Sequence, residues 1–265
     1  MIKKILNITV WVLAIAGLFV SLAFSAHESD KIPCKSIKIE VDNTSGNFFV
    51  RNDDVLDIIY SKGDSLVGSP ITSIPIAVYE RQITANPSVK RAEVYTKHNG
   101  VFAVKIYQRE PILRVFNVYG ESYYLDRDGN VMPTSENYTA RVPVASGFIT
   151  DKQFKMQRYN VAEMTDSMNQ KSRLDELFRL ATFIRNDEFW KAQIQQIRVE
   201  PNGELTLIPT VGDHHILLGR TDNMEQKFKK LLLFYRKGLN KTGWDQYSHI
   251  NLKYKDQVIC TKKNS

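Results

Sequence analysis

Residues 5–24 form an apolar run without a charged side chain. A helix of this length is about 30 Å long, which matches the hydrocarbon core of a bilayer. Lys3 and Lys4 precede the run, and the cytoplasmic flanks of membrane helices are typically basic. The pattern therefore predicts a short cytoplasmic tail (1–4), a single transmembrane helix (5–24) and a tether (25–35), with the remaining chain exported. A cleaved signal peptide is the alternative, although its apolar core usually has about 7–15 residues.

Residues 36–109 combine two periodicities in the order strand, helix, helix, strand, strand. Period-two alternation indicates strands with one buried face, and apolar residues spaced by three and four indicate helices. The predicted strands are 36–41, 89–96 and 101–106, and the helical faces are Val55, Ile58, Ile59 and Ile76, Tyr79, Ile83. We expect Asn52 and Ser73 to cap the two helices. Asn99-Gly100 between the last two strands predicts a hairpin.

Residues 110–265 predict a mainly antiparallel β domain with flanking helices, so the whole chain is expected to be α+β. Expected strands cover 112–118, 122–125, 131 onward, 197–199, 205–208 and 216–218, and expected helices cover 172–184 and 222–238, with a weaker one at 151–171. The final segment alternates, with Ile250, Leu252 and Tyr254 on one face. We expect it to continue through Val258 to Cys260 as the last strand.

Composition and charge exclude several classes of protein. The chain has 265 residues, of which 43% are hydrophobic and 25% charged, so a disordered or low-complexity chain is excluded. The net charge of +7 permits anionic partners, but nucleic acid is not expected for an exported protein. The basic helix positions around Lys227 to Lys237 are interpreted as a solvated face. Cys34 and Cys260 leave a disulfide open, although nothing in the sequence brings them together.

Catalytic and metal-binding patterns are absent from the sequence. His214 and His215 are adjacent, and neighbouring side chains on a strand point to opposite faces, so they are poor partners for one metal ion. Asp126–Asn130 has too early a glycine for a calcium loop and is interpreted as a tight turn. We therefore predict that the chain is not an enzyme and holds no cofactor, metal or small-molecule substrate.

Four segments in order resemble known sequences of one family. Asn86–Val94 resembles the end of the second helix of a POTRA domain, and Val104–Ile112 resembles the junction to the domain that follows. Tyr124–Val131 resembles the Tyr-Leu-Val-Asp-x-x-Gly signature of that domain, and Ile250–Val258 resembles its last strand. With the predicted anchor and the strand-helix-helix-strand-strand unit, the chain resembles the bacterial cell-division family FtsQ, also called DivIB. The resemblance implies a POTRA domain at 36–109 and an FtsQ-type β domain at 110–265.

This resemblance also implies a function. FtsQ-like proteins are non-enzymatic scaffolds of the division septum in the cytoplasmic membrane, and they bind FtsB-type (DivIC) and FtsL-type proteins to control septal peptidoglycan synthesis. Other division proteins are implied to bind the POTRA domain. The implied partner-binding residues lie in the last strand: Ile250, Leu252, Lys253, Tyr254, Lys255 and Val258. An exposed strand edge can accept a partner strand, and Tyr254 is the expected anchor.

Three alternatives stay open on the sequence alone. The first alternative is that Tyr254 is a core residue and not an anchor, because it lies on the same face of the predicted strand as Ile250 and Leu252. Lys253 and Lys255 either contact an acidic partner or protect an edge against aggregation. The third alternative concerns the function of the whole chain. It could be a POTRA-type factor for transport or outer-membrane assembly, although the sequence lacks the lipid-facing strand pattern of a barrel. It could also be an anchored periplasmic enzyme, although the sequence shows no catalytic constellation.

Overall fold

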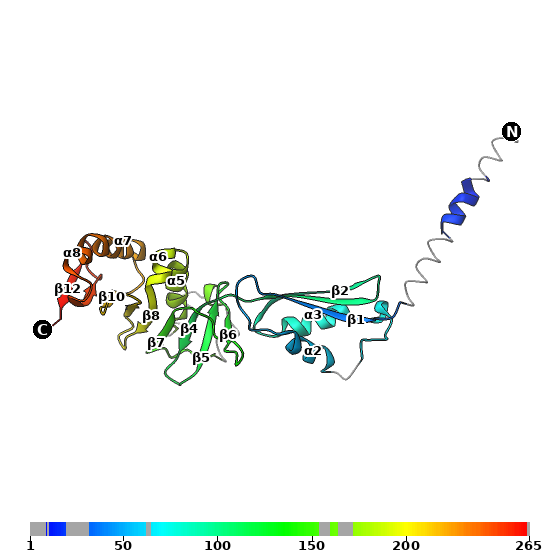
Figure 1. The fold of residues 1–265 in the computed structure, drawn as a ribbon, viewed down its shortest axis with the longest axis horizontal. Coiled ribbons are helices and arrows are strands. Elements are labelled where there is room, and N and C mark those ends of the chain that lie inside the picture. Colours follow the sequence, from blue (N-terminus) through cyan, green and yellow to red (C-terminus); the bar gives the residue numbers. More distant parts are fainter. Residues whose placement is uncertain are drawn as a thin grey trace. The chain divides into compact units, whose positions relative to one another are not determined.

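The computed structural model describes Thr9 and residues 11–19, 32–61, 65–153, 160–163 and 172–263. Its contacts divide the chain into two compact units, Met1–Gln108 and Arg109–Ser265 (Figure 1). Residues 11–19 are helical, and their side chains are exposed. Within the described ranges, no helix is long and apolar enough to span a bilayer. Most of the remaining predicted span 5–24 lies outside these ranges.

The first unit has the predicted element order. Its elements are β1 (Ser36–Asp42), α2 (Asn52–Tyr60), the 3-10 turn η1 (Ile71–Ser73), α3 (Ile76–Thr84), β2 (Val89–Lys97) and β3 (Val101–Gln108). The strands form a sheet in the order β1-β3-β2, with β1 parallel and β2 antiparallel to β3. The hairpin at Asn99-Gly100 is confirmed, and Gly100 takes a φ of +86° that favours glycine.

Both helices pack on the same side of this small sheet (Figure 1). Tyr79 of α3 meets Phe102 of β3 edge to face, with 5.7 Å between the ring centroids. The buried Gln108 side chain accepts the Val50 amide at 2.9 Å. The predicted caps were wrong. The backbone of Arg51 begins α2, with its amide bound by Asp54, and Ser73 ends η1 instead of starting α3.

The second unit contains one large mixed sheet. Its strands are β4 (Pro111–Phe116), β5 (Ser122–Asp126), β6 (Val131–Pro133), β7 (Val144–Gly147), β8 (Ile194–Val199), β9 (Leu205–Pro209), β10 (His215–Gly219), β11 (Tyr247–Asn251) and β12 (Ile259–Lys262). Their order in space is β12-β11-β10-β9-β8-β7-β4-β5-β6. Five of the neighbouring pairs are antiparallel and three are parallel, so the α+β class with a mainly antiparallel domain is confirmed.

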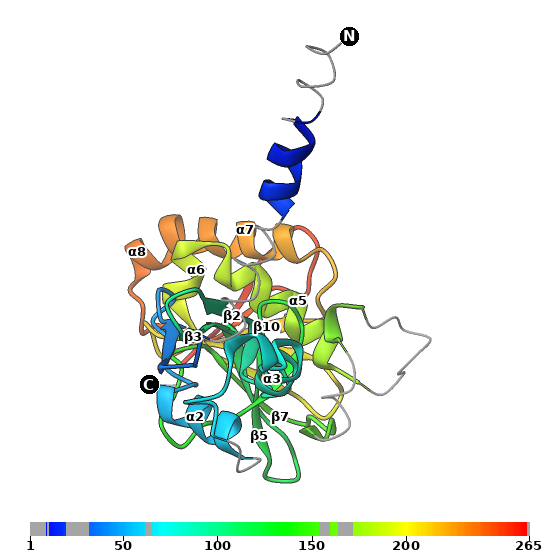
Figure 2. The ribbon, with the colours of Figure 1, turned by 90° about the vertical axis from the view of Figure 1, so that its right-hand side faces the viewer.

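Helices cover one face of this sheet (Figures 1 and 2). They are α5 (Leu174–Arg185), α6 (Glu188–Gln193), α7 (Met224–Phe234), the π-helical segment η3 (Tyr235–Leu239) and α8 (Asn240–Thr242). Apolar side chains from the helices and the covered face of the sheet make one core, in which the Phe228 ring lies tilted against Phe183 and edge to face with Trp190. Burial of this apolar surface is the main force holding the sheet and its helices together.

Several details of the second unit differ from the sequence predictions, and helix α6 was not predicted. The chain continues as a helix past Gly238 through η3 and α8, and it ends at Gly243. Strand β7 was not predicted. In the predicted helix 151–171, Gln153 is helical and Val161–Glu163 form a short 3-10 turn, η2, while most of the other residues lie outside the described ranges.

Candidate docking site

Strand β12 forms one edge of the large sheet. It pairs antiparallel with β11, whereas β11 also pairs in parallel with β10. Within the described part of the chain, no strand pairs with the other side of β12. The amide of Lys263 donates inward to the Gln246 carbonyl at 3.1 Å, and successive amides of a strand alternate in direction. The amide of Lys262 therefore points to the open edge.

The prediction of a single last strand from Ile250 onward was wrong. Strand β11 ends at Asn251, and the chain reverses before β12 begins at Ile259. Ile250 and Leu252 are both 0% exposed and belong to the core. Asn251 pairs with Leu217 of β10, and the next amide, that of Leu252, donates to the Leu217 carbonyl at 3.0 Å as the last bond of this parallel ladder. We call residues Leu252–Asp256 the exit turn.

The exit turn presents Tyr254 to solvent. Its side chain is 47% exposed, so the alternative of a core tyrosine is wrong. Lys253 and Lys255 are exposed as well, whereas Val258 is half-buried and packs against the core. The structure thus divides the six predicted residues into a buried pair, a half-buried valine and three exposed side chains in one turn.

Lys253 is already engaged within the chain. Its ammonium lies 3.1 Å from the Glu204 carboxylate, and this hydrogen bond lowers the pKa of Glu204. Its aliphatic stem covers Gly219, where an added Cβ would come within 2.9 Å of the lysine Cγ. Only glycine at position 219 leaves room for this stem, so the ion pair and the close approach fix the direction of Lys253.

Sequence reasoning missed Lys230, which contacts the exit turn from α7. Its Nζ donates to the carbonyl oxygens of Leu252 at 3.5 Å, of Lys255 at 3.0 Å and of Tyr254. The sequence places it among basic residues interpreted as a solvated face. Its acceptors lie 22 to 25 residues further along the chain, and no local sequence pattern predicts a contact over that separation.

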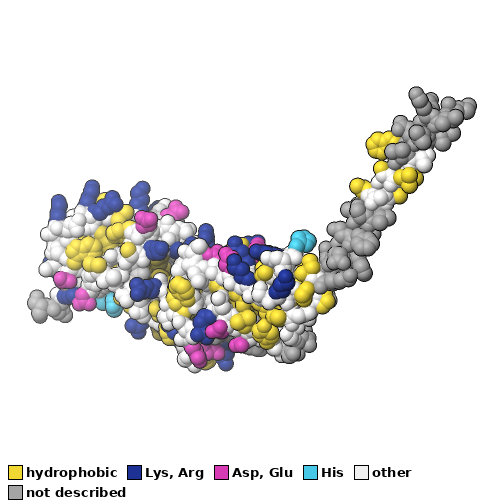
Figure 3. Space-filling model, turned by 45° about the vertical axis from the view of Figure 1, so that its right-hand side comes forward, with side chains coloured by type: hydrophobic (Ala, Val, Ile, Leu, Met, Phe, Trp, Pro, Cys, Tyr) yellow, Lys and Arg dark blue, Asp and Glu magenta, His cyan; other side chains and the backbone are white. Residues whose placement is uncertain are grey.

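The other basic side chains over α7 and its continuation are mostly solvated. Lys229, Arg236, Lys237 and Lys241 are exposed, and Figure 3 shows Lys and Arg side chains gathered beside hydrophobic ones on the second unit. Lys227 differs because it is buried, where it donates to the Arg220 carbonyl at 2.8 Å and pairs with Asp222. The interpretation of a solvated basic face therefore fails for Lys227 and Lys230.

The histidines and cysteines that the structure describes do not assemble a metal site. His214 is buried, and its Nε2 lies 2.8 Å from the Tyr235 hydroxyl. Burial lowers the pKa of His214 to about 4, so it is neutral at pH 7. Cys34 and Cys260 are both free thiols, and burial raises the pKa of Cys260. Among the described residues, no three metal-binding side chains lie together.

The predicted tight turn at Asp126–Asn130 is confirmed. The Asp126 carboxylate accepts the backbone amides of Asp128 and Asn130 at 2.9 and 2.7 Å. It also pairs with Arg109 at 2.8 Å. A carboxylate occupied by these donors organises its own turn, which gives a physical reason for the signature Tyr124–Val131. We call residues Asp126–Asn130 the signature turn.

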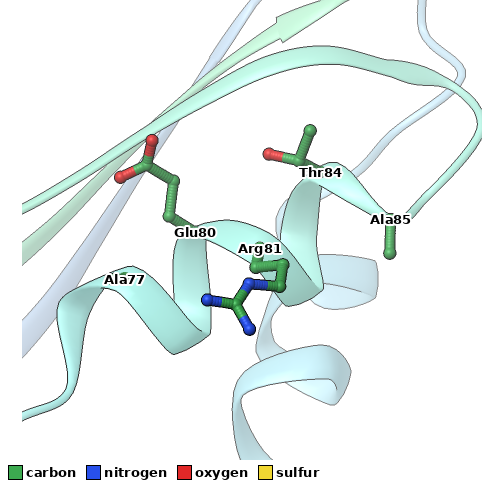
Figure 4. A pocket seen from close by; sticks show the side chains of 5 residues that line it. All are labelled: Ala77, Glu80, Arg81, Thr84 and Ala85. Atoms are coloured by element: carbon green, nitrogen blue, oxygen red, sulfur yellow. The ribbon is translucent and has the colours of Figure 1, made fainter.

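A surface hollow on the first unit lies along α3. It is lined by Ala77, Glu80, Arg81, Thr84 and Ala85 (Figure 4). All five come from α3 and the residue that follows it, so this hollow does not bring groups from several elements together around one point. A catalytic cleft needs such convergence. Within the described chain, the edge of β12 with the exit turn is the better candidate for function.

Comparisons with known proteins found matches to both units of the chain. Residues 110–261 match the family model described as FtsQ/DivIB, C-terminal related, and residues 32–107 match a POTRA-like domain. The chain is also similar to the cell division protein FtsQ of Salinibacter ruber (strain DSM 13855 / M31), with 24% identity over 187 residues, which cover 70% of this chain and 68% of that protein. The first match spans more than half of the chain, as the ordered motifs predicted. The chain therefore belongs to the FtsQ/DivIB family.

Proposed function

We propose that this protein is a non-enzymatic scaffold of cell division, which binds an FtsB-type (DivIC) partner along the open edge of β12 and beside the exit turn. FtsL-type proteins join through the same complex, and the POTRA-like unit contacts further division proteins. The scaffold thereby controls septal peptidoglycan synthesis from the outer side of the cytoplasmic membrane. Family membership and the named relative support the cell-division role.

The observation that carries this proposal is the side of β12 that no other strand of the described residues pairs with, next to an exposed tyrosine. A strand edge offers free amide and carbonyl groups, and a partner segment gains backbone hydrogen bonds by adding to it. Tyr254 supplies a large contact area at the end of this edge, and tyrosine loses little conformational freedom on binding. Backbone pairing and one aromatic anchor together provide affinity and register.

The set of residues proposed to contact the partner is smaller than the set that the sequence alone implies. Lys253, Tyr254 and Lys255 are accessible to a partner, whereas Ile250 and Leu252 support them from the core. Val258 lies between these two groups. Strand β12 itself adds Ile259, which is 42% exposed, and the outward amide of Lys262.

The membrane anchor of this scaffold is the apolar run 5–24, with residues 1–4 in the cytoplasm. Within it, residues 11–19 are helical, and Trp11, Leu13 and Phe19 are more than 60% exposed. A lipid environment removes the cost of exposing these side chains to water. Protease protection in spheroplasts tests this topology, because a cytoplasmic second unit would stay protected.

Tyr254→Ala and Lys262→Pro test the docking site in the full-length chain. The proline removes the outward amide of β12, and Lys262→Ala is its matched control because it keeps that amide. We expect at least a tenfold loss of affinity for the FtsB-type protein of the same organism with Tyr254→Ala and with Lys262→Pro, and almost none with Lys262→Ala. Unchanged affinity in both, measured by titration calorimetry with folding checked by circular dichroism, contradicts the proposed site.

A fluorescent fusion tests the cellular role. We expect the full-length protein to gather at midcell in dividing cells, and the Tyr254→Ala variant to recruit less of the FtsB-type partner there. Uniform staining of the envelope in dividing cells would argue against a division scaffold.

A further inference from the structure

Lys230 brings a cation to the middle of the exit turn. Its ammonium donates to the carbonyl oxygens of Leu252, Tyr254 and Lys255, the first at 3.5 Å and the last at 3.0 Å. A lysine ammonium has three N–H donors and no acceptor, so these three carbonyls use its full capacity. Hydrogen bonds from a charged donor are stronger than those between neutral groups.

Other contacts hold the same turn from β10 and from the last residue of β11. The Leu252 amide is bound by the Leu217 carbonyl at 3.0 Å, and the Lys253 amide is bound by the Asn251 side chain at 3.0 Å. The stem of Lys253 rests against Gly219. The main chain of 252–255 is thus tied on both sides, and the side chains of Tyr254 and Lys255 project from it.

The geometry points to Lys230 as a positioning residue that orders the exit turn and so presents Tyr254 to the partner. This inference rests on the proposed function. A partner that binds a turn already in its bound conformation does not lose the entropy of ordering it. Lys230 acts on affinity through the main chain of the turn, without touching the partner.

The neighbouring Lys229 provides a matched control. It lies one position earlier on α7 and is exposed. Lys229→Met removes the same charge from the same helix, whereas Lys230→Met also removes the three hydrogen bonds to the turn. Long-range electrostatic effects on an acidic partner are therefore similar in the two variants.

Amide hydrogen exchange measures the order of the turn without a partner. In the full-length chain, Lys230→Met is expected to speed exchange at the amides of Leu252 and Lys253 about tenfold, because local opening becomes easier. Exchange in β9 is expected to stay unchanged, and Lys229→Met is expected to match the parent protein. Equal exchange at the turn in both variants overturns the inference.

A double-mutant cycle then tests whether Lys230 works through Tyr254. We expect Lys230→Met to weaken binding of the FtsB-type partner about tenfold in the parent chain. In the Tyr254→Ala background it should cause almost no further loss, because there is no anchor left to position. A full loss in both backgrounds means that Lys230 contacts the partner itself, and this result overturns the inference.

The two failures are distinguishable. If Tyr254→Ala binds the partner normally, the docking site is wrong and the presenting role of Lys230 falls with it, even where exchange shows an ordered turn. If Tyr254→Ala weakens binding while Lys230→Met changes neither exchange nor affinity, the docking site stands and only the positioning role is overturned.

Discussion

Two turns at opposite ends of the large sheet are held by opposite charges. The signature turn between β5 and β6 is organised by an anion, the Asp126 carboxylate, which accepts two backbone amides from within the turn. The exit turn between β11 and β12 is organised by a cation, the Lys230 ammonium, which donates to three carbonyls from a helix outside the turn.

The difference lies in where the holding group comes from. Asp126 is part of its own turn, so the signature turn forms from neighbouring residues whenever β5 and β6 pair. Lys230 comes from α7, and its position depends on the packing of α7 through buried neighbours such as Leu231. The signature turn is therefore stabilised by its own residues, whereas the order of the exit turn depends on the packing of α7.

The largest effect on stability is expected from removing the carboxylate that holds the signature turn. Asp126→Ala leaves two turn amides unbound and removes the partner of Arg109, whose side chain is 21% exposed. We expect the free energy of unfolding of the second unit to fall by about 3 kcal/mol. Urea titration followed by tryptophan fluorescence measures this, because Trp190 and Trp244 lie in that unit.

Glu136→Ala is the control for this measurement. Glu136 is an exposed carboxylate in the same unit, and its removal is expected to change the free energy of unfolding by less than about 0.5 kcal/mol. A similar small change in Asp126→Ala would mean that the signature turn does not depend on its carboxylate.

The second effect concerns the glycine of the signature turn. Gly129 has a φ of +85°, and an added Cβ would meet the Ala162 amide nitrogen at 2.7 Å. Gly120 has a similar φ of +81° but open space around it. We expect Gly129→Ala to lower the free energy of unfolding by about 2.5 kcal/mol and Gly120→Ala by about 1 kcal/mol, because only the first adds a clash to backbone strain. Equal losses in the same urea titration would show that residues 160–163 yield without cost.

The same contrast explains which parts of the fold the sequence predicted. Hairpin signals such as Asn99-Gly100 and the Tyr79 and Ile83 stripe of α3 depend on residues close in the chain, and both are confirmed. Strand β7 has no alternating pattern of its own. It is a strand because β4 and β8 pair with it on both sides, which is a property of the assembled sheet.

The candidate site was predictable only in part for the same reason. The resemblance to a family placed Tyr254 in a binding segment, and its exposure agrees with a contact role. The alternation of Ile250, Leu252 and Tyr254 predicted one strand, but the ladder with β10 ends at the Leu252 amide and the chain bends at residues 254–256. The role of Lys230 could not be predicted from neighbouring residues, because its acceptors in the exit turn are far away in the sequence and meet it only through the packing of α7.

The third effect is a pH dependence at the exit-turn end of the sheet. His214 joins the segment before β10 to Tyr235 in the continuation of α7, at 2.8 Å. Burial lowers the pKa of His214 from 6.5 to about 4; His215 and Lys263 add to the lowering, and Asp213 opposes it. The unfolded state binds the proton first, so this contribution to stability is present above pH 6.5 and is lost as the pH falls toward 4.

Between pH 7 and pH 5, this group should lower the free energy of unfolding by about 2 kcal/mol. Urea titrations at several pH values measure the slope, and His214→Gln provides the comparison because glutamine does not titrate. We expect the variant to have a flatter slope between these pH values, whatever its absolute stability. Equal slopes for the two proteins would mean that protonation of His214 does not lower the free energy of unfolding.

The smallest effect on stability distinguishes two roles for Lys253. The side chains of Lys253 and Glu204 are 38% and 35% exposed, so breaking their ion pair should change the free energy of unfolding by less than about 0.5 kcal/mol. Affinity for the proposed FtsB-type partner is the informative readout. If Lys253 contacts an acidic group of the partner, Lys253→Met weakens binding, whereas Glu204→Gln releases the ammonium and leaves binding equal or stronger. If the ion pair only fixes the exit turn, as the hydrogen bonds of Lys230 do, both variants weaken binding to the same extent.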